Sequence, residues 1–219
     1  MDFVLDLSSL KTERYFIIGD ICGNYDLLIE ALYEQNFNKN DTLITTGNIL
    51  NLEKDTSLDC IYFIMNNKNT YSVKGKNEFD LINKKEYPLW LKDSENSEDI
   101  IKYLDELPLV IKATDNMFII NSGAEPNKSL EDQIPDVFYS IGNYDKDSRF
   151  YLFDNPEEKS WYDFEFKDGD TPIKFCFSGK IDLRETKAGF PLGQNKDGSR
   201  LRYLIIDKMN QDSPILIET

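Results

Sequence analysis

The segment Gly19–Asn24, with the pattern G-D-x-x-G-N, is the first place where the sequence could carry chemistry. It follows the apolar run 15–19 and precedes an amphipathic stretch for which Asn24 is a suitable N-cap. Asp20 would therefore project a carboxylate from a strand end, where a metal ion could neutralise it, and the helix N-terminus behind it favours an anion. The same residues also suit a tight turn in which Asp20 caps the helix.

Histidine is absent from all 219 residues. This excludes Ser-His-Asp and Cys-His catalysis, histidine-ligated zinc or haem, and a histidine general base. The three cysteines, Cys22, Cys60 and Cys176, form no C-x-x-C pair and are too few for a disulfide framework or a four-cysteine zinc site. Their number favours a reducing compartment.

The chain is acidic, with 25 basic and 40 acidic residues and a formal net charge of −15. This balance argues against nucleic acid as a partner, because nucleic-acid binding needs a basic surface. A basic protein partner or mimicry of nucleic-acid charge is compatible with it, and so is a solvated shell that keeps the protein soluble. The N-terminus lacks the basic and apolar regions of a signal peptide, and the longest apolar stretch is 60–65. We therefore expect a cytoplasmic protein with no membrane partner, and the oligomeric state stays open.

The elements that position Asp20 alternate between strand and helix patterns. Strands are expected at 15–19, 42–46 and 70–75, with helices following Asn24 and at 57–66. This order predicts parallel strands with right-handed crossovers, and the loops at 19–24 and 47–52 then leave the carboxyl ends of strands, where α/β proteins bind ligands.

The second half predicts a helix at 97–106 and strands that mostly pair antiparallel. The strand patterns lie at 109–113, 117–121, 172–179, 201–207 and 214–218, and 135–170 and 184–200 are interpreted as loop-rich. We expect one α/β domain over residues 1–219, built as a two-sheet β-sandwich flanked by helices.

Five motifs, in this order and spacing, resemble the calcineurin-like metallophosphoesterases, in particular the branch of serine/threonine protein phosphatases and diadenosine tetraphosphatases. GDICGN resembles the family's G-D-x-H-G-N, DTLITTGNIL the start of G-D-x-x-D-R-G, and YSVKGKNEFDL the strand and G-N-H-E. The segment 107–133 resembles the hairpin that leads to H-A-G together with the acidic-Pro-Asn tail after it, and FCFSGKID lies where the family has V-x-G-H-T. The resemblance implies an α-β-β-α layered fold with two divalent metals, such as manganese, iron or zinc, that activate water against a phosphoester.

At the family's ligand positions this chain departs from the pattern. Asp20 is retained, and the other ligand-equivalent positions are occupied by Cys22, Asn48, Lys76, Asn121 and Lys180. The family's catalytic positions are occupied by Asn51, Leu52 and Asn77, and only Glu78 matches there. Leucine cannot hold a phosphate and asparagine has no titratable proton. We therefore expect no catalytic residues, no metal and no cofactor.

Lys76 and Lys180 would, on this alignment, place ammonium groups where the metals lie. Lysine has no lone pair for a metal while it is protonated, and it gives a buried carboxylate a partner. We expect the lysines to replace the metal charge beside Asp20, or to form an anion pocket with Asp20 and Asn24. The alternative is that both lysines reach solvent and Asp20 caps its turn. For Cys22, a small filler is favoured over a thiolate nucleophile, because neither a histidine base nor an arginine-rich phosphate cradle is present.

The function expected from these residues is that of a pseudophosphatase: a catalytically inactive metallophosphoesterase-fold protein that binds a protein, or a phosphorylated small molecule or peptide. One alternative is a weak or atypical metal-dependent phosphoesterase or protein phosphatase with a metal held by Asp20, Cys22 and Asn48. A second alternative is an acidic inhibitor or immunity-type protein that blocks a basic partner.

Overall fold

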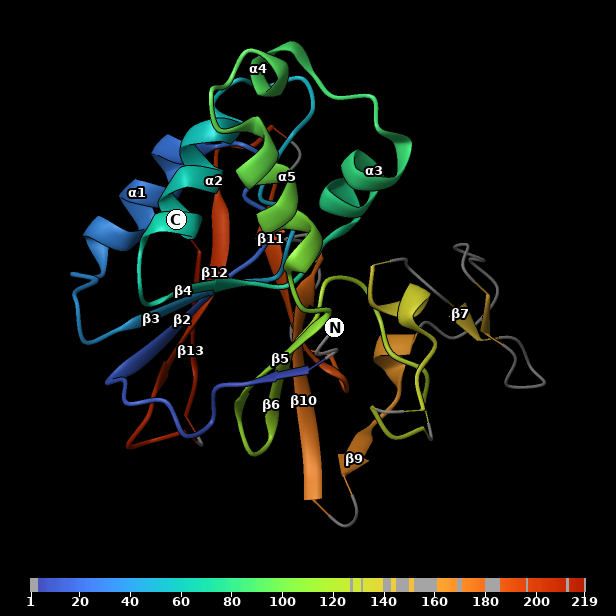
Figure 1. Ribbon diagram of the computed structural model, residues 1–219. Helices are drawn as coiled ribbons and strands as arrows, with labels where there is room; N and C mark the ends of the chain where they lie inside the picture. Colours follow the sequence, from blue (N-terminus) through green and yellow to red (C-terminus); the bar gives the residue numbers. More distant parts are fainter. Residues whose placement is uncertain are drawn as a thin grey trace.

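A computed structural model gives the architecture of the chain (Figure 1). The residues that it describes are 4–126, 128–130, 132–139, 143–144, 150–151, 161–168, 171–179, 186–195, 197–211 and 213–218.

The first half alternates strands and helices, as the sequence predicts. Its elements are β1 (Val4–Asp6), β2 (Arg14–Ile18), α1 (Tyr25–Glu34), β3 (Thr42–Thr45), α2 (Ser57–Asn66), β4 (Thr70–Ser72), α3 (Lys76–Lys84), α4 (Leu89–Lys92) and α5 (Ser97–Glu106). Strands β2, β3 and β4 pair in parallel, which confirms the predicted βαβ order. Asn24 is the N-cap of α1, and its side chain accepts a hydrogen bond from the Leu27 N–H.

The second half is dominated by strands. Its elements are β5 (Val110–Thr114), β6 (Met117–Ile119), the 3-10 turn η1 (Pro135–Phe138), β7 (Asn143–Tyr144), β8 (Phe150–Tyr151), η2 (Trp161–Asp163), β9 (Phe166–Asp168), β10 (Thr171–Ser178), β11 (Gly189–Gln194), β12 (Leu201–Asp207) and β13 (Ile215–Glu218). The hairpin β5–β6 is antiparallel as predicted, whereas β10 pairs in parallel with both β6 and β11.

One curled sheet runs through both halves, in the order β1-β5-β6-β10-β11-β12-β2-β3-β4. Strand β11 joins the two halves, because it pairs with β10 on one side and with the start of β12 on the other. The sequence pattern predicts a loop-rich segment over 184–200, and β11 lies within it. Its composition explains the error, since Gly189, Pro191 and Gly193 are poor strand formers.

Three apolar clusters give the layers. Between the facing halves of the sheet lie side chains such as Ile17, Ile44, Ile119 and Leu204. Helices α1, α2 and α5 cover the outer face of the β2–β3–β12 half (Figure 1). In the described part of the chain, the outer face of β10 and β6 is covered by Trp161 and the η1 residues rather than by long helices. The layered arrangement is thus confirmed, but one continuous curled sheet forms both β-layers in place of two separate sheets, and the second cover is less regular.

Within the described residues, none of the helices combines the length and the apolar character that crossing a membrane would need.

Candidate functional site

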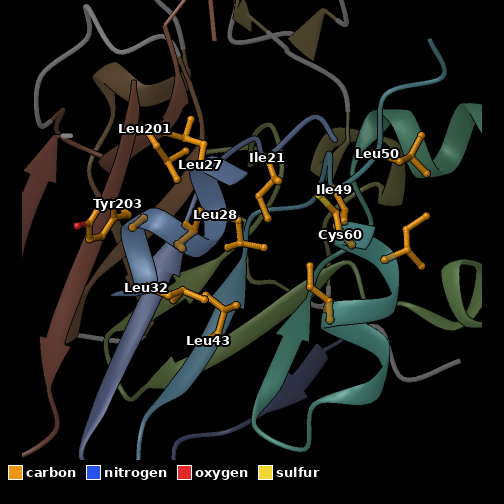
Figure 2. Packing of buried hydrophobic residues seen from close by; sticks show 14 of the residues in the cluster. Ile21, Leu27, Leu28, Leu32, Leu43, Ile49, Leu50, Cys60, Leu201 and Tyr203 are labelled. Carbon is orange, nitrogen blue, oxygen red and sulfur yellow. The ribbon is translucent and has the colours of Figure 1, made fainter. Parts of the chain in front are cut away.

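The loops that carry Asp20 and Asn48 follow the carboxyl ends of β2 and β3 and are anchored by apolar side chains. Ile21, Ile49 and Leu50 are at most 1% exposed and insert into the cluster under α1 and α2 (Figure 2). Two backbone hydrogen bonds, from Cys22 N–H to Asn48 O and from Gly23 N–H to Ile49 O, both 2.8 Å, tie the loops together. The polar side chains between these anchors are therefore held in place by the core.

The loops after β3 and β4 touch through their backbones. Gly47 has φ +82°, and a Cβ there would lie 2.6 Å from Gly75 Cα. A Cβ on Gly75 would lie 2.3 Å from Asn48 N. Both glycines are required because any larger residue would separate the two loops.

The buried Glu78 side chain connects these two loops through hydrogen bonds. It is fully buried, and its two carboxylate oxygens accept four backbone N–H groups: Asn48 (2.8 Å), Gly75 (2.9 Å), Ile49 (2.8 Å) and Leu50 (3.3 Å). Burial raises the pKa of Glu78, and these hydrogen bonds oppose the rise. The retained glutamate therefore has a structural role in this chain.

Asp20 lies at the centre of the site. Its Oδ1 accepts the Asn48 side-chain amide at 2.9 Å and the hydroxyl of Ser178, which comes from the end of β10 in the other half of the sheet. Burial raises the pKa of Asp20 from its ordinary value of 3.8 to about 6, against the lowering effect of these two hydrogen bonds. The carboxylate is thus partnered by neutral groups.

Asn121 and Thr46 extend this arrangement. The Asn121 Nδ2 donates to Thr46 O at 2.7 Å and to Ser178 Oγ at 2.9 Å, and Thr46 Oγ1 lies 3.1 Å from Ser178 Oγ. Because the single Ser178 proton goes to Asp20, Ser178 accepts from both Asn121 and Thr46. We call Asp20, Asn48, Asn121, Ser178 and Thr46 the polar cluster.

The structure corrects the expectation for Lys76. Its ammonium forms an ion pair with Asp80 Oδ1 at 2.6 Å, one helical turn further along α3, and its side chain is 49% exposed. Pairing with Asp80 keeps the ammonium hydrated, whereas burial beside Asp20 would cost desolvation of both charges. Only the Lys76 backbone reaches the polar cluster, where its N–H donates to Asn121 Oδ1 at 3.2 Å.

Lys180 and Asn24 were also expected to form the anion pocket. Lys180 lies outside the described residues. Asn24 is occupied by structural contacts, since it caps α1 and its Nδ2 donates to Gly198 O at 2.9 Å. An anion pocket formed by Asp20, Asn24, Lys76 and Lys180 would require the Lys76 ammonium to leave Asp80, and it stays a prediction.

Cys22 lies beside the polar cluster as a thiol. Burial raises its pKa to about 12, and the nearby carboxylates of Asp20 and Glu78 add to the rise. A thiol with such a pKa is protonated at neutral pH and is a poor nucleophile. This environment favours the interpretation of Cys22 as a filler.

Asn51, Leu52 and Asn77, which stand at the family's catalytic positions, form hydrogen bonds that stabilise the loops. The Asn77 Nδ2 donates to Leu50 O at 2.8 Å, and the Asn51 N–H donates to Ser57 Oγ at 2.9 Å. Leu52 is 39% exposed, and its carbonyl accepts the Trp90 indole N–H at 3.2 Å. None of these three side chains can donate a proton to a leaving group.

The donor set of the polar cluster does not suit two divalent cations. Asp20 is its only carboxylate, and the amide oxygens of Asn48 and Asn121 already accept the backbone N–H groups of Asn77 and Lys76. Across the described residues, no three His, Cys, Asp or Glu side chains come together as a metal-binding group. Hard cations need several anionic or carbonyl oxygens that are free to coordinate.

Ser178 and Thr46 were missed by the sequence analysis. Ser178 lies two residues before Lys180, the residue that stands at the family's histidine position. Its position as a polar residue ending the apolar strand β10 is the signal that could have identified it.

Comparisons with known proteins agree with this architecture. The sequence matches no protein-family model and no curated protein. Among solved structures, the chain is similar to the crystal structure of a "putative diadenosine tetraphosphatase", with a TM-score of 0.74 and 22% identity over 98% of this chain and 97% of that one.

Two further structures share the fold. A serine/threonine phosphatase from Saccharomyces cerevisiae, with similarity to human phosphatase PP5, gives a TM-score of 0.58 at 14% identity over 98% of this chain and 82% of its own. A metallophosphoesterase from Sphaerobacter thermophilus gives 0.53 at 14% identity over 95% and 88%. These similarities confirm the expected fold.

Proposed function

We propose that this chain, which has the metallophosphoesterase fold, acts by binding a partner and does not hydrolyse phosphoesters by the two-metal route. The observation that carries the proposal is the polar cluster. Asp20, Asn48, Asn121 and Ser178 form hydrogen bonds with one another, whereas a two-metal enzyme needs these positions as free ligands.

The weak-enzyme alternative has less support. A metal held by Asp20, Cys22 and Asn48 would have to displace the proton of the Cys22 thiol, which burial favours. It would also need Asn48 to turn its amide away from Asp20, which would break a 2.9 Å hydrogen bond. Both changes oppose metal binding.

A protein is the better supported partner. A phosphorylated ligand at the polar cluster would have to break the ion pair with Asp80 in order to use the Lys76 ammonium. The net charge of −15 favours a partner with a basic surface, as the inhibitor alternative also requires. Such binding weakens as salt is added.

Hydrolysis of p-nitrophenyl phosphate in the presence of Mn²⁺ or Zn²⁺ tests the proposal. We expect the wild-type chain and the Asp20→Asn variant to give the same rate as buffer with metal alone. Turnover in the wild type that Asp20→Asn abolishes would contradict the proposal and would support the weak-enzyme alternative.

A further inference from the structure

A groove of about 640 Å³ lies at the amino edge of the sheet, opposite the polar cluster. Three chain segments form it: residues 9–13 before β2, residues 39–40 before β3, and residues 208–211 after β12. Because β2 and β3 are parallel and β12 runs antiparallel to β2, these segments meet at one edge. Asp20 and Asn48 follow the other ends of the same strands.

The charge of this groove differs from that of the chain. It is lined by three lysines, Lys11, Lys39 and Lys208, and by one acidic residue, Glu13, in a protein of net charge −15. Glu13 accepts the Asn40 side-chain amide at 2.8 Å. Nowhere in the described residues does a carboxylate lie within ion-pair distance of Lys11 or Lys39.

The Lys208 ammonium is held in place by backbone carbonyl groups. It donates to the carbonyl of Ser8 at 2.9 Å and to that of Leu10, and it lies 5.7 Å from the centre of the Tyr15 ring. Tyr15 is fully buried, and its hydroxyl donates to Leu7 O at 2.7 Å. Both hydrogen-bond acceptors are backbone carbonyls, so these contacts hold the Lys208 ammonium at the groove without placing a carboxylate beside it.

The lining also provides apolar contact. Leu10 and Met209 line the groove, and Met209 is 95% exposed. A methionine side chain adapts readily to the shape of a ligand. The volume falls within the range of small-molecule sites, roughly 300–1,000 Å³.

We propose that this groove binds a small organic phosphate, with the phosphate on the lysines and the organic part on Leu10 and Met209. Three lysines and one glutamate leave two positive charges, which balance a phosphate monoester of charge about −2 at neutral pH. Lysine ammonium groups serve as point charges for phosphate. This site is independent of the polar cluster and of whether the chain hydrolyses anything.

Calorimetric titration of the full chain with 1-naphthyl phosphate tests the proposal. The double variant Lys11→Gln/Lys39→Gln should weaken binding at least about tenfold, because two charge-assisted contacts are lost. Both lysines are exposed, so their replacement should not affect folding. Inorganic phosphate and 1-naphthol should each bind more weakly than 1-naphthyl phosphate.

The matched control is Lys167→Gln/Lys187→Gln, which makes the same change in net charge. These lysines line a second groove of about 540 Å³ beside β9 and β10. We expect this control and Asp20→Asn to bind 1-naphthyl phosphate as the wild type does. The proposal is overturned if no binding is seen, if both double variants weaken it equally, or if inorganic phosphate binds as tightly. Loss of binding in Lys76→Gln/Lys180→Gln would also overturn it, by assigning the phosphate to the carboxyl edge.

Discussion

The charged side chains at the two edges of the β2–β3 sheet differ in whether they have hydrogen-bond or ion-pair partners. At the carboxyl edge, Asp20 is surrounded by amide and hydroxyl groups, and the nearest lysine of α3 pairs elsewhere. At the amino edge, Lys11 and Lys39 have no described carboxylate partner. The polar groups at the carboxyl edge are thus satisfied by one another, whereas the opposite edge keeps charge available for a ligand.

The largest expected effect concerns Glu78, which closes the carboxyl edge. Glu78→Ala would leave four buried backbone N–H groups without their acceptor. We expect the free energy of unfolding to fall by more than about 3 kcal/mol, measured by urea denaturation. Glu78→Gln keeps one carbonyl oxygen and should lose less. A change below about 0.5 kcal/mol in Glu78→Ala would show that solvent already reaches these amides.

Asp20→Asn should stabilise the protein at pH 8. The folded-state pKa of Asp20 is raised from 3.8 to about 6, so ionisation of Asp20 destabilises the folded protein. This destabilisation is absent below pH 3.8 and is complete above about pH 6. Asparagine avoids this cost and still offers Oδ1 to Asn48 and Ser178. We expect a gain of about 1–3 kcal/mol at pH 8 that disappears near pH 4.

Urea denaturation of Asp20→Asn and the wild type between pH 4 and pH 8 measures this difference. A constant difference across that range would mean that Asp20 does not titrate with a raised pKa. A loss of stability at pH 8 would mean that the charge is neutralised by a cation, as the lysine-replacement hypothesis requires.

Ser178→Ala should destabilise the protein by about 1–2 kcal/mol at pH 8, because the ionised Asp20 loses a hydrogen-bond donor. The loss should shrink towards pH 5, where Asp20 is largely protonated. Ser72→Ala removes another buried hydroxyl, one that donates to Val73 O at 2.8 Å, away from Asp20. The decrease in the free energy of unfolding caused by Ser72→Ala should therefore not change as Asp20 titrates. Similar pH profiles for the two variants would contradict this role of Ser178.

Lys76→Gln should have the smallest effect, less than about 0.5 kcal/mol, because an exposed i,i+4 ion pair contributes little. Lys74→Gln is the contrast, since the Lys74 side chain is only 8% exposed and its ammonium donates to Asp105 O at 2.6 Å. Denaturation of both variants at pH 8 checks this order. A loss of several kcal/mol in Lys76→Gln would restore Lys76 as the partner of Asp20.

Local sequence patterns predicted much of the fold. The apolar runs at 15–19 and 42–46 and the capped helix after Asn24 became β2, β3 and α1, because their periodicity and capping agree with their burial. Strand β11 was missed because its place depends on close backbone packing. Gly189 has φ +147°, and a Cβ there would lie 2.0 Å from Phe175 O. Such tertiary contacts leave no periodic signal in a sequence.

The candidate site was predicted less well than the fold. Motif spacing located Asp20, Asn48 and Asn121, and all three meet in the structure. The direction of the Lys76 side chain could not be derived from an alignment position, because it depends on Asp80 one turn further along α3. Ser178 and Thr46 join the polar cluster through contacts between segments far apart in the sequence.

Metal content is the most direct test of the central claim, that the carboxyl edge is satisfied without metals. The purified chain and Asp20→Asn would be incubated with Mn²⁺ and Zn²⁺, separated from free ions, and measured by elemental mass spectrometry. The account predicts far less than one metal per chain, with no difference between the two proteins. One or more metals per wild-type chain, lost in Asp20→Asn, would contradict it.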